Sequence, residues 1–96
     1  MQFDASKIGA VRRYLEGELP NTTVRDSYNF EREAQDFAVG HGASARLVTV
    51  SGEFLRVHRA DGIENVLRRW HLGEAIENAG DARVIVTSKG LEIETL

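Results

Sequence analysis

Cysteine is missing from this chain of 96 residues, and proline occurs only once. The lack of cysteine excludes disulfides, thiolate catalysis and cysteine-ligated metal sites. It also fits the reducing environment of the cytoplasm, where we expect the protein to act. With one proline and no low-complexity run, the sequence does not have the composition of a disordered chain. We therefore expect an ordered protein that is stabilised by packing alone.

Long apolar runs are missing too, and no stretch approaches the ~20 residues that a membrane-spanning helix needs. The first residues, MQFDASKIGAV, include the acidic Asp4 and no extended apolar segment, so we expect neither a signal peptide nor membrane association. The hydrophobic share of 42% and the charged share of 28% are typical of globular proteins. The length suits one soluble domain over residues 1–96.

A strong excess of one charge is likewise absent, because 12 basic and 15 acidic residues give a net charge of −3. Residues 41–72 carry five basic and three acidic residues, whereas residues 73–96 carry two basic and five acidic ones. This pattern is far from the basic footprint of a nucleic-acid-binding domain. A mildly basic middle and an acidic C-terminal part instead favour complementary contacts between copies of the chain.

Local patterns predict most of the helices and strands. Helical spacing of apolar residues and the N-cap candidate Asp4 predict a helix over residues 4–16. A second helix is expected to begin after Asp61, with a kinked continuation that ends at Gly80. Strands are expected at residues 22–28, 36–39 and 45–50, and a final hairpin at residues 83–96, with its turn at Lys89-Gly90.

The segment VTVSGEFLRVH leaves two structures open. Gly52-Glu53 has the glycine-first signature of a type II′ turn, which predicts a further hairpin that places Val50 opposite Leu55. A helix that starts at Ser51 is the alternative, with Phe54, Leu55 and His58 on one side. We favour the hairpin slightly.

These elements give the order α-β-β-β-(β)-α-β-β, in which most neighbouring strands are joined by tight turns. An alternation of this kind predicts the α+β class. We expect a single domain with a mainly antiparallel sheet and two or three helices packed on one face.

The sequence LRRWH at residues 67–71 raises the question of a binding site. On a helix, Trp70 would lie at the centre of the apolar stripe with Ile63, and Arg68 and Arg69 would point to water, with Glu64 placed to pair with Arg68. We therefore interpret Trp70 as core. The exposed arginine pairs of the two helices form a possible binding surface: Arg12, Arg13, Arg68, Arg69 and His71.

No motif names a reaction. GHGASA matches a dinucleotide-binding fingerprint at Gly40, Gly42 and Ala45, but a strand follows it where that motif requires a helix, so a hairpin turn at Gly40–Ser44 is the better interpretation. The three histidines have no metal-ligand spacing, and none of the serines lies in a GxSxG sequence. We expect no catalytic residues, no cofactor and no metal.

The C-terminal strand is the second candidate site. A strand at the end of a chain can lie at the edge of a sheet, where unpaired main-chain groups are available to another chain, or it can pair centrally with only Leu96 fraying; the sequence favours neither position. Leu91 and Ile93 face one side and Glu92 and Glu94 the other, so these four residues form a possible dimer edge. A dimer should place the basic middle segment near Glu92 or Glu94.

We therefore expect a non-enzymatic protein-interaction or self-associating module, working as a homodimer or with a protein partner. The alternative is a small nucleic-acid-associated regulator that uses the exposed arginine pairs, although the net charge disfavours nucleic acid. An enzyme whose site lies at a subunit boundary is a weaker third possibility.

Overall fold

A computed structural model describes residues 3–95. The first half of the chain holds one helix, α1, and three strands, and the second half holds three helices and two strands. The elements are α1 (Ala5–Glu18), β1 (Val24–Asn29), β2 (Ala34–Val39), β3 (Arg46–Ser51), α2 (Gly52–Val57), α3 (Ala60–Arg69), α4 (Leu72–Ala79), β4 (Arg83–Thr87) and β5 (Gly90–Glu94).

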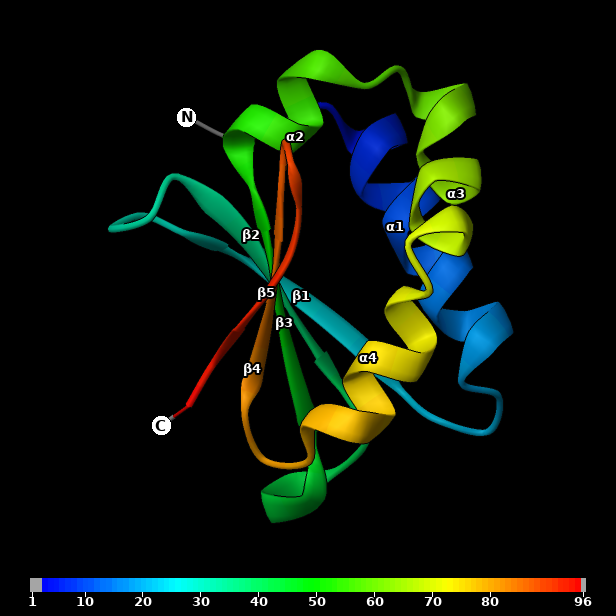
Figure 1. Ribbon diagram of the computed structural model, residues 1–96, viewed down its shortest axis with the longest axis vertical. Coiled ribbons are helices and arrows are strands. Elements are labelled where there is room, and N and C mark those ends of the chain that lie inside the picture. Colours follow the sequence, from blue (N-terminus) through cyan, green and yellow to red (C-terminus); the bar gives the residue numbers. More distant parts are fainter. Residues whose placement is uncertain (1–2, 96) are drawn as a thin grey trace.

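The five strands form one sheet in the order β1-β2-β3-β4-β5. All neighbours are antiparallel except β3 and β4, which run parallel because α2, α3 and α4 connect them. Figure 1 shows α1, α3 and α4 on one side of the twisted sheet, with α2 near the ends of its strands. The predicted α+β class, the element order and the packing of the helices on one face are confirmed.

The core lies between this helix layer and the sheet. α1 packs on α3, and its residues Ala10, Val11 and Leu15 are fully buried. Alternate strand residues, among them Phe37 and Val48, fill the same layer from the sheet side, as the pleat of a half-covered sheet requires. The N-cap predicted at Asp4 is confirmed, because its carboxylate accepts from the Ser6 N–H at 2.9 Å.

The preference for a second hairpin after β3 is wrong, and residues 52–57 form helix α2. Ser51 acts as its N-cap, with Oγ accepting from the Phe54 N–H at 3.1 Å. The helix buries Phe54 and Leu55 together, whereas a hairpin would have placed these two neighbours on opposite faces. Burial in the tertiary structure therefore determines the conformation of this segment, because its local signals fit both a helix and a hairpin.

The second helical region differs from expectation at its start. The cap of α3 is Arg59, and Asp61 lies in the first turn. The kink falls between α3 and α4, where His71 has the left-handed φ of 57°. The end at Gly80 is confirmed, and Arg46 fixes that end by donating from Nη1 to the Ile76 and Gly80 carbonyls at 3.1 and 3.3 Å.

Trp70 does not lie at the centre of the core. Helix α3 ends at Arg69, so Trp70 occupies the C-cap position and is only partly buried. The centroid of its ring lies 5.7 Å from that of Phe54 and 6.3 Å from that of His58, and the Phe54 and His58 rings are 4.3 Å apart. Trp70 therefore borders the core, whose centre in this helix is formed by Ile63 and Leu67.

The GHGAS segment forms the expected turn between β2 and β3. Gly40 and Gly42 have φ of 109° and 56°, values that favour glycine, and a short 3-10 helix, η1, covers Gly42–Ser44. Strand β3 follows directly, so the helix that a dinucleotide site would need is not there. Within residues 3–95, no helix has the length and apolar character needed to cross a membrane.

Candidate functional site

The face of the sheet opposite the helices carries polar side chains in regular rows. The strand registers bring Arg25, Ala38, Leu47, Arg83 and Glu94 into one row across all five strands. A second row contains Ser27, Asp36, Thr49, Ile85 and Glu92. The rows on this uncovered face thus combine both signs of charge with the apolar residues Ala38, Leu47 and Ile85.

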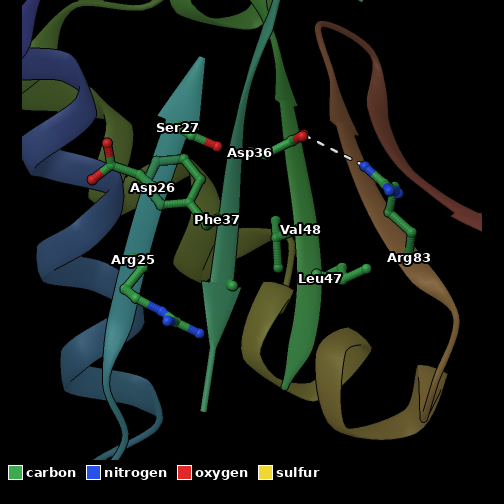
Figure 2. A pocket seen from close by; sticks show the side chains of 9 residues that line it. Arg25, Asp26, Ser27, Asp36, Phe37, Leu47, Val48 and Arg83 are labelled. Carbon is green, nitrogen blue, oxygen red and sulfur yellow. Dashed lines mark hydrogen bonds and ion pairs between the residues drawn. The ribbon is translucent and has the colours of Figure 1, made fainter. Parts of the chain in front are cut away.

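A shallow depression of about 330 Å³ lies in this face, between β1 and β4. Figure 2 shows Arg25 and Arg83 on opposite sides of it, with Leu47 between them and the Asp36–Arg83 ion pair at one rim. Ser27 and Ala38 complete the lining on this side of the sheet.

Asp36 is the centre of a hydrogen-bond network beside the depression. Its carboxylate accepts from Thr49 Oγ1 at 2.7 Å, from Asn29 Nδ2 at 3.0 Å and from Arg83 Nη1 at 3.5 Å. Arg83 Nη1 also donates to Thr49 Oγ1 at 2.8 Å, and its Nε lies 3.6 Å from Glu94 Oε1. These contacts hold the guanidinium of Arg83, whose side chain is 19% exposed, although its buried Nε forms no hydrogen bond within the described residues.

Arg32, from the turn between β1 and β2, reaches the same group of charges. Its Nη2 donates to both carboxylate oxygens of Glu94, at 2.8 and 3.0 Å. These hydrogen bonds, reinforced by the carboxylate charge, raise the pKa of Arg32, so the guanidinium stays charged. Glu94 is thereby balanced by Arg32 and Arg83, and neither belongs to the basic segment 41–72.

The two edges of the sheet differ. At the β1 edge, Arg12 of α1 donates to the Val24 carbonyl and forms an ion pair with Asp26. Gln35 holds the other carboxylate oxygen of Asp26 at 3.0 Å, while its own Oε1 is buried without a hydrogen-bond partner in the described chain. A side chain therefore occupies part of the main-chain edge of β1.

The β5 edge has no such occupant. Its turn has only two residues, so Thr87 and Gly90 form a hydrogen-bonded pair, and the pairs alternate from there. Leu91 and Ile93 are therefore in non-hydrogen-bonded positions, with their N–H and C=O groups directed away from β4. No hydrogen bond from elsewhere in residues 3–95 reaches these groups. The Ile93 side chain is 53% exposed, because the helix layer does not extend over β5.

Most of the arginines that were predicted to form a basic surface make ion pairs or hydrogen bonds with other residues. Arg12 turns toward β1, as described above, and Arg13 lies 3.3 Å from Glu64 across the α1–α3 contact. Because Glu64 pairs with Arg13, the expected Glu64–Arg68 pair does not form, and Arg68 Nη1 donates to Asn65 instead. Arg69 and His71 are exposed. Two of the four guanidinium groups are thus balanced by carboxylates.

Sequence reasoning missed the residues of the depression. Arg25, Asp36 and Arg83 belong to three different strands, and their proximity depends on the parallel register between β3 and β4. That register follows a connection of three helices, which no local pattern predicts. The alternation of residues along β1 and β2 was the only usable signal. It indicates on which face of the sheet a side chain lies, but not which side chains of other strands lie beside it.

Groups suited to metal chemistry do not gather anywhere in the described chain: no three His, Asp or Glu side chains lie close enough to hold an ion. His41 lies in the β2–β3 turn, 3.4 Å from Thr23 Oγ1, and His58 packs against Phe54. The candidate sites are therefore the uncovered face with its depression and the free edge at β5. Comparison with protein families, curated proteins and solved structures finds no significant match to this chain.

Proposed function

We propose that this protein is a non-enzymatic interaction module that associates with a second copy of itself along β5. The observation that carries the proposal is the outward orientation of the Leu91 and Ile93 main-chain groups on an edge strand that nothing in residues 3–95 covers. Unpaired edge groups of this kind form hydrogen bonds readily with another strand.

The symmetry of a homodimer limits the ways in which two β5 strands can pair. Two identical edges pair most simply in antiparallel fashion around a two-fold axis. Leu91 and Ile93 carry the outward main-chain groups. If one of these residues pairs with its own copy, the two-fold axis lies beside that residue. If Leu91 pairs with Ile93 of the second copy, the axis lies beside Glu92. The second case brings the two Glu92 carboxylates face to face, which is unfavourable.

Two registers remain. An axis at Leu91 would place Ile93 opposite Lys89 of the turn, so the axis at Ile93 pairs more of β5. In that register Glu92 faces Glu94 of the second copy, whose carboxylate is already balanced by Arg32 and Arg83. On the other face, Ile93 meets its own copy and covers apolar surface that is now exposed. The balancing charges come from Arg32 and Arg83, so the interface does not require the basic segment 41–72.

The pairing is short, because β5 has only five residues. Stable protein interfaces bury about 1,200–2,000 Å² in total, and one short strand pair covers less. We therefore expect a reversible dimer whose population rises with concentration. The alternative function in nucleic-acid binding has weaker support, since Arg12 and Arg13 are paired with carboxylates.

Light scattering coupled to gel filtration, from low to high micromolar concentration, tests the proposal. Ile93→Pro removes one outward N–H without taking a hydrogen bond from β4, and edge strands tolerate proline. Ile93→Thr retains the N–H and is the matched control. We expect the proline variant to be monomeric at concentrations where the threonine variant is a dimer. A wild-type monomer at high micromolar concentration, or a folded proline variant that still dimerises, contradicts the proposal.

A further inference from the structure

The depression on the uncovered face owes its shape to one cross-strand row. Arg25 is aligned with Ala38, and Ala38 with Leu47, while the parallel register brings Arg83 level with Leu47. The Cα atoms of the two arginines are thus about three strand spacings apart, or about 14 Å. Two long side chains flank two short ones, which leaves the hollow of about 330 Å³.

The charges around the hollow are unequally balanced. Asp36 accepts three hydrogen bonds, one of them from Arg83, so its charge is largely compensated. Arg83 is also close to Glu94. Arg25 is exposed and forms no ion pair with any residue between 3 and 95. The positive charge that remains available in the depression is therefore that of Arg25, and Arg83, hydrogen-bonded to Asp36 and Thr49, adds a second guanidinium at the far side.

We propose that this depression binds a small organic carboxylate with a short apolar chain. A guanidinium group offers two parallel N–H donors that match the two oxygens of a carboxylate. Arg25 would hold the acid group, and the chain would lie on Ala38 and Leu47 in the direction of Arg83. The volume is at the lower end of the range for small-molecule sites, about 300–1,000 Å³, which suits a ligand of this size.

The ligand must be an anion rather than a cation. The one carboxylate that lines the depression on this face, Asp36, has its oxygens occupied by Thr49, Asn29 and Arg83. A cation would have to displace those donors, whereas an anion meets Arg25 without breaking any contact. The site lies on β1 to β4 and does not include β5, so it is independent of the proposed dimer edge.

Nitrogen-15 NMR titration with sodium butyrate tests this site. Butyramide and butylammonium serve as neutral and cationic probes of similar length. We expect saturable shifts in β1, β2 and β3 with butyrate, with a Kd of about 1–10 mM as usual for so small a ligand. Arg25→Gln should weaken binding about tenfold by removing the charge-assisted hydrogen bonds. Arg69→Gln removes an exposed arginine from the helix layer and should leave binding unchanged.

Ala38→Leu provides a second test that keeps every charge. Filling the hollow should abolish the butyrate shifts while distant resonances show a folded protein. Equal binding of butyramide or butylammonium, equal affinity in Arg25→Gln, or unaltered binding in Ala38→Leu would overturn the proposal. Loss of dimerisation in Ile93→Pro has no bearing on these shifts, so failure of one proposal is distinguishable from failure of the other.

Discussion

Among the glycines, Gly52 leaves the least room for an added methyl group. It is buried at the start of α2, where an added Cβ would lie 2.6 Å from the Glu33 carbonyl oxygen and 2.9 Å from the ring of Phe3. The Glu33 oxygen belongs to the main chain and accepts from the Gly52 N–H at 3.0 Å. It cannot retreat from the methyl group without weakening that hydrogen bond.

The expected cost follows from these contacts. Overpacking of this kind costs about 1–3 kcal/mol, and a weakened hydrogen bond adds about 0.5–1.5 kcal/mol. We expect Gly52→Ala to lower the free energy of unfolding by about 1.5–4.5 kcal/mol. Gly62→Ala is the matched control: nothing lies within 4 Å of its added Cβ, and alanine is the better helix former, so stability should rise by about 0.5–1 kcal/mol.

Urea denaturation followed by circular dichroism gives both values by linear extrapolation. A Gly52→Ala protein as stable as the wild type would show that the turn before β2 does not pack on the start of α2. A similar loss in both variants would indicate a general intolerance of alanine in these helices, and the steric argument would fail.

Two further predictions concern Tyr14 and nucleic acid. Tyr14 is 2% exposed and its hydroxyl oxygen accepts from the Gly73 N–H at 2.9 Å, so Tyr14→Phe should cost about 1–3 kcal/mol in urea denaturation. Burial raises the pKa of Tyr14 above 10.0, so the unfolded chain loses this proton first; stability should be complete below about pH 10 and fall above it, and Tyr14→Phe should reduce that fall. Binding to duplex DNA in a fluorescence anisotropy titration should be no tighter than the ~10⁻⁴–10⁻⁶ M of non-specific contacts. Nanomolar affinity that is lost on the double change Arg68→Glu, Arg69→Glu would instead support the nucleic-acid alternative.

The sequence predicts those parts of the fold in which one local signal dominates. Asp4 caps α1, the glycines at 40 and 42 form a turn, and Gly90 begins β5 with a φ of 145°. At Ser51-Gly52 the same two residues suit a helix cap and a hairpin turn, so only the burial of Phe54 separates the alternatives. The prediction that Trp70 lies at the centre of the core is wrong, because α3 ends one residue before it.

The candidate sites likewise differ in whether a local signal in the sequence predicts them. The alternation of Leu91 and Ile93 with Glu92 and Glu94 is local, and it correctly predicts the two faces of β5. The residues around the depression come together only after α2, α3 and α4 return the chain to the sheet beside β3. Arg25 and Arg83 are 58 positions apart in the printed sequence, and no periodicity connects them.

The position of Arg12 on the β1 edge has a consequence for the size of any assembly. A sheet with two open edges can add copies head to tail without limit, which leads to fibres. Here a strand arriving at β1 would have to break the Arg12–Asp26 ion pair and remove the guanidinium from the Val24 carbonyl. These contacts of Arg12 oppose growth at the β1 edge. The proposed pairing of β5 with its own copy would occupy the β5 edge of both molecules. If β5 pairs with its own copy as proposed, the Arg12 contacts at the β1 edge oppose further growth, and we expect the assembly to stop at a dimer.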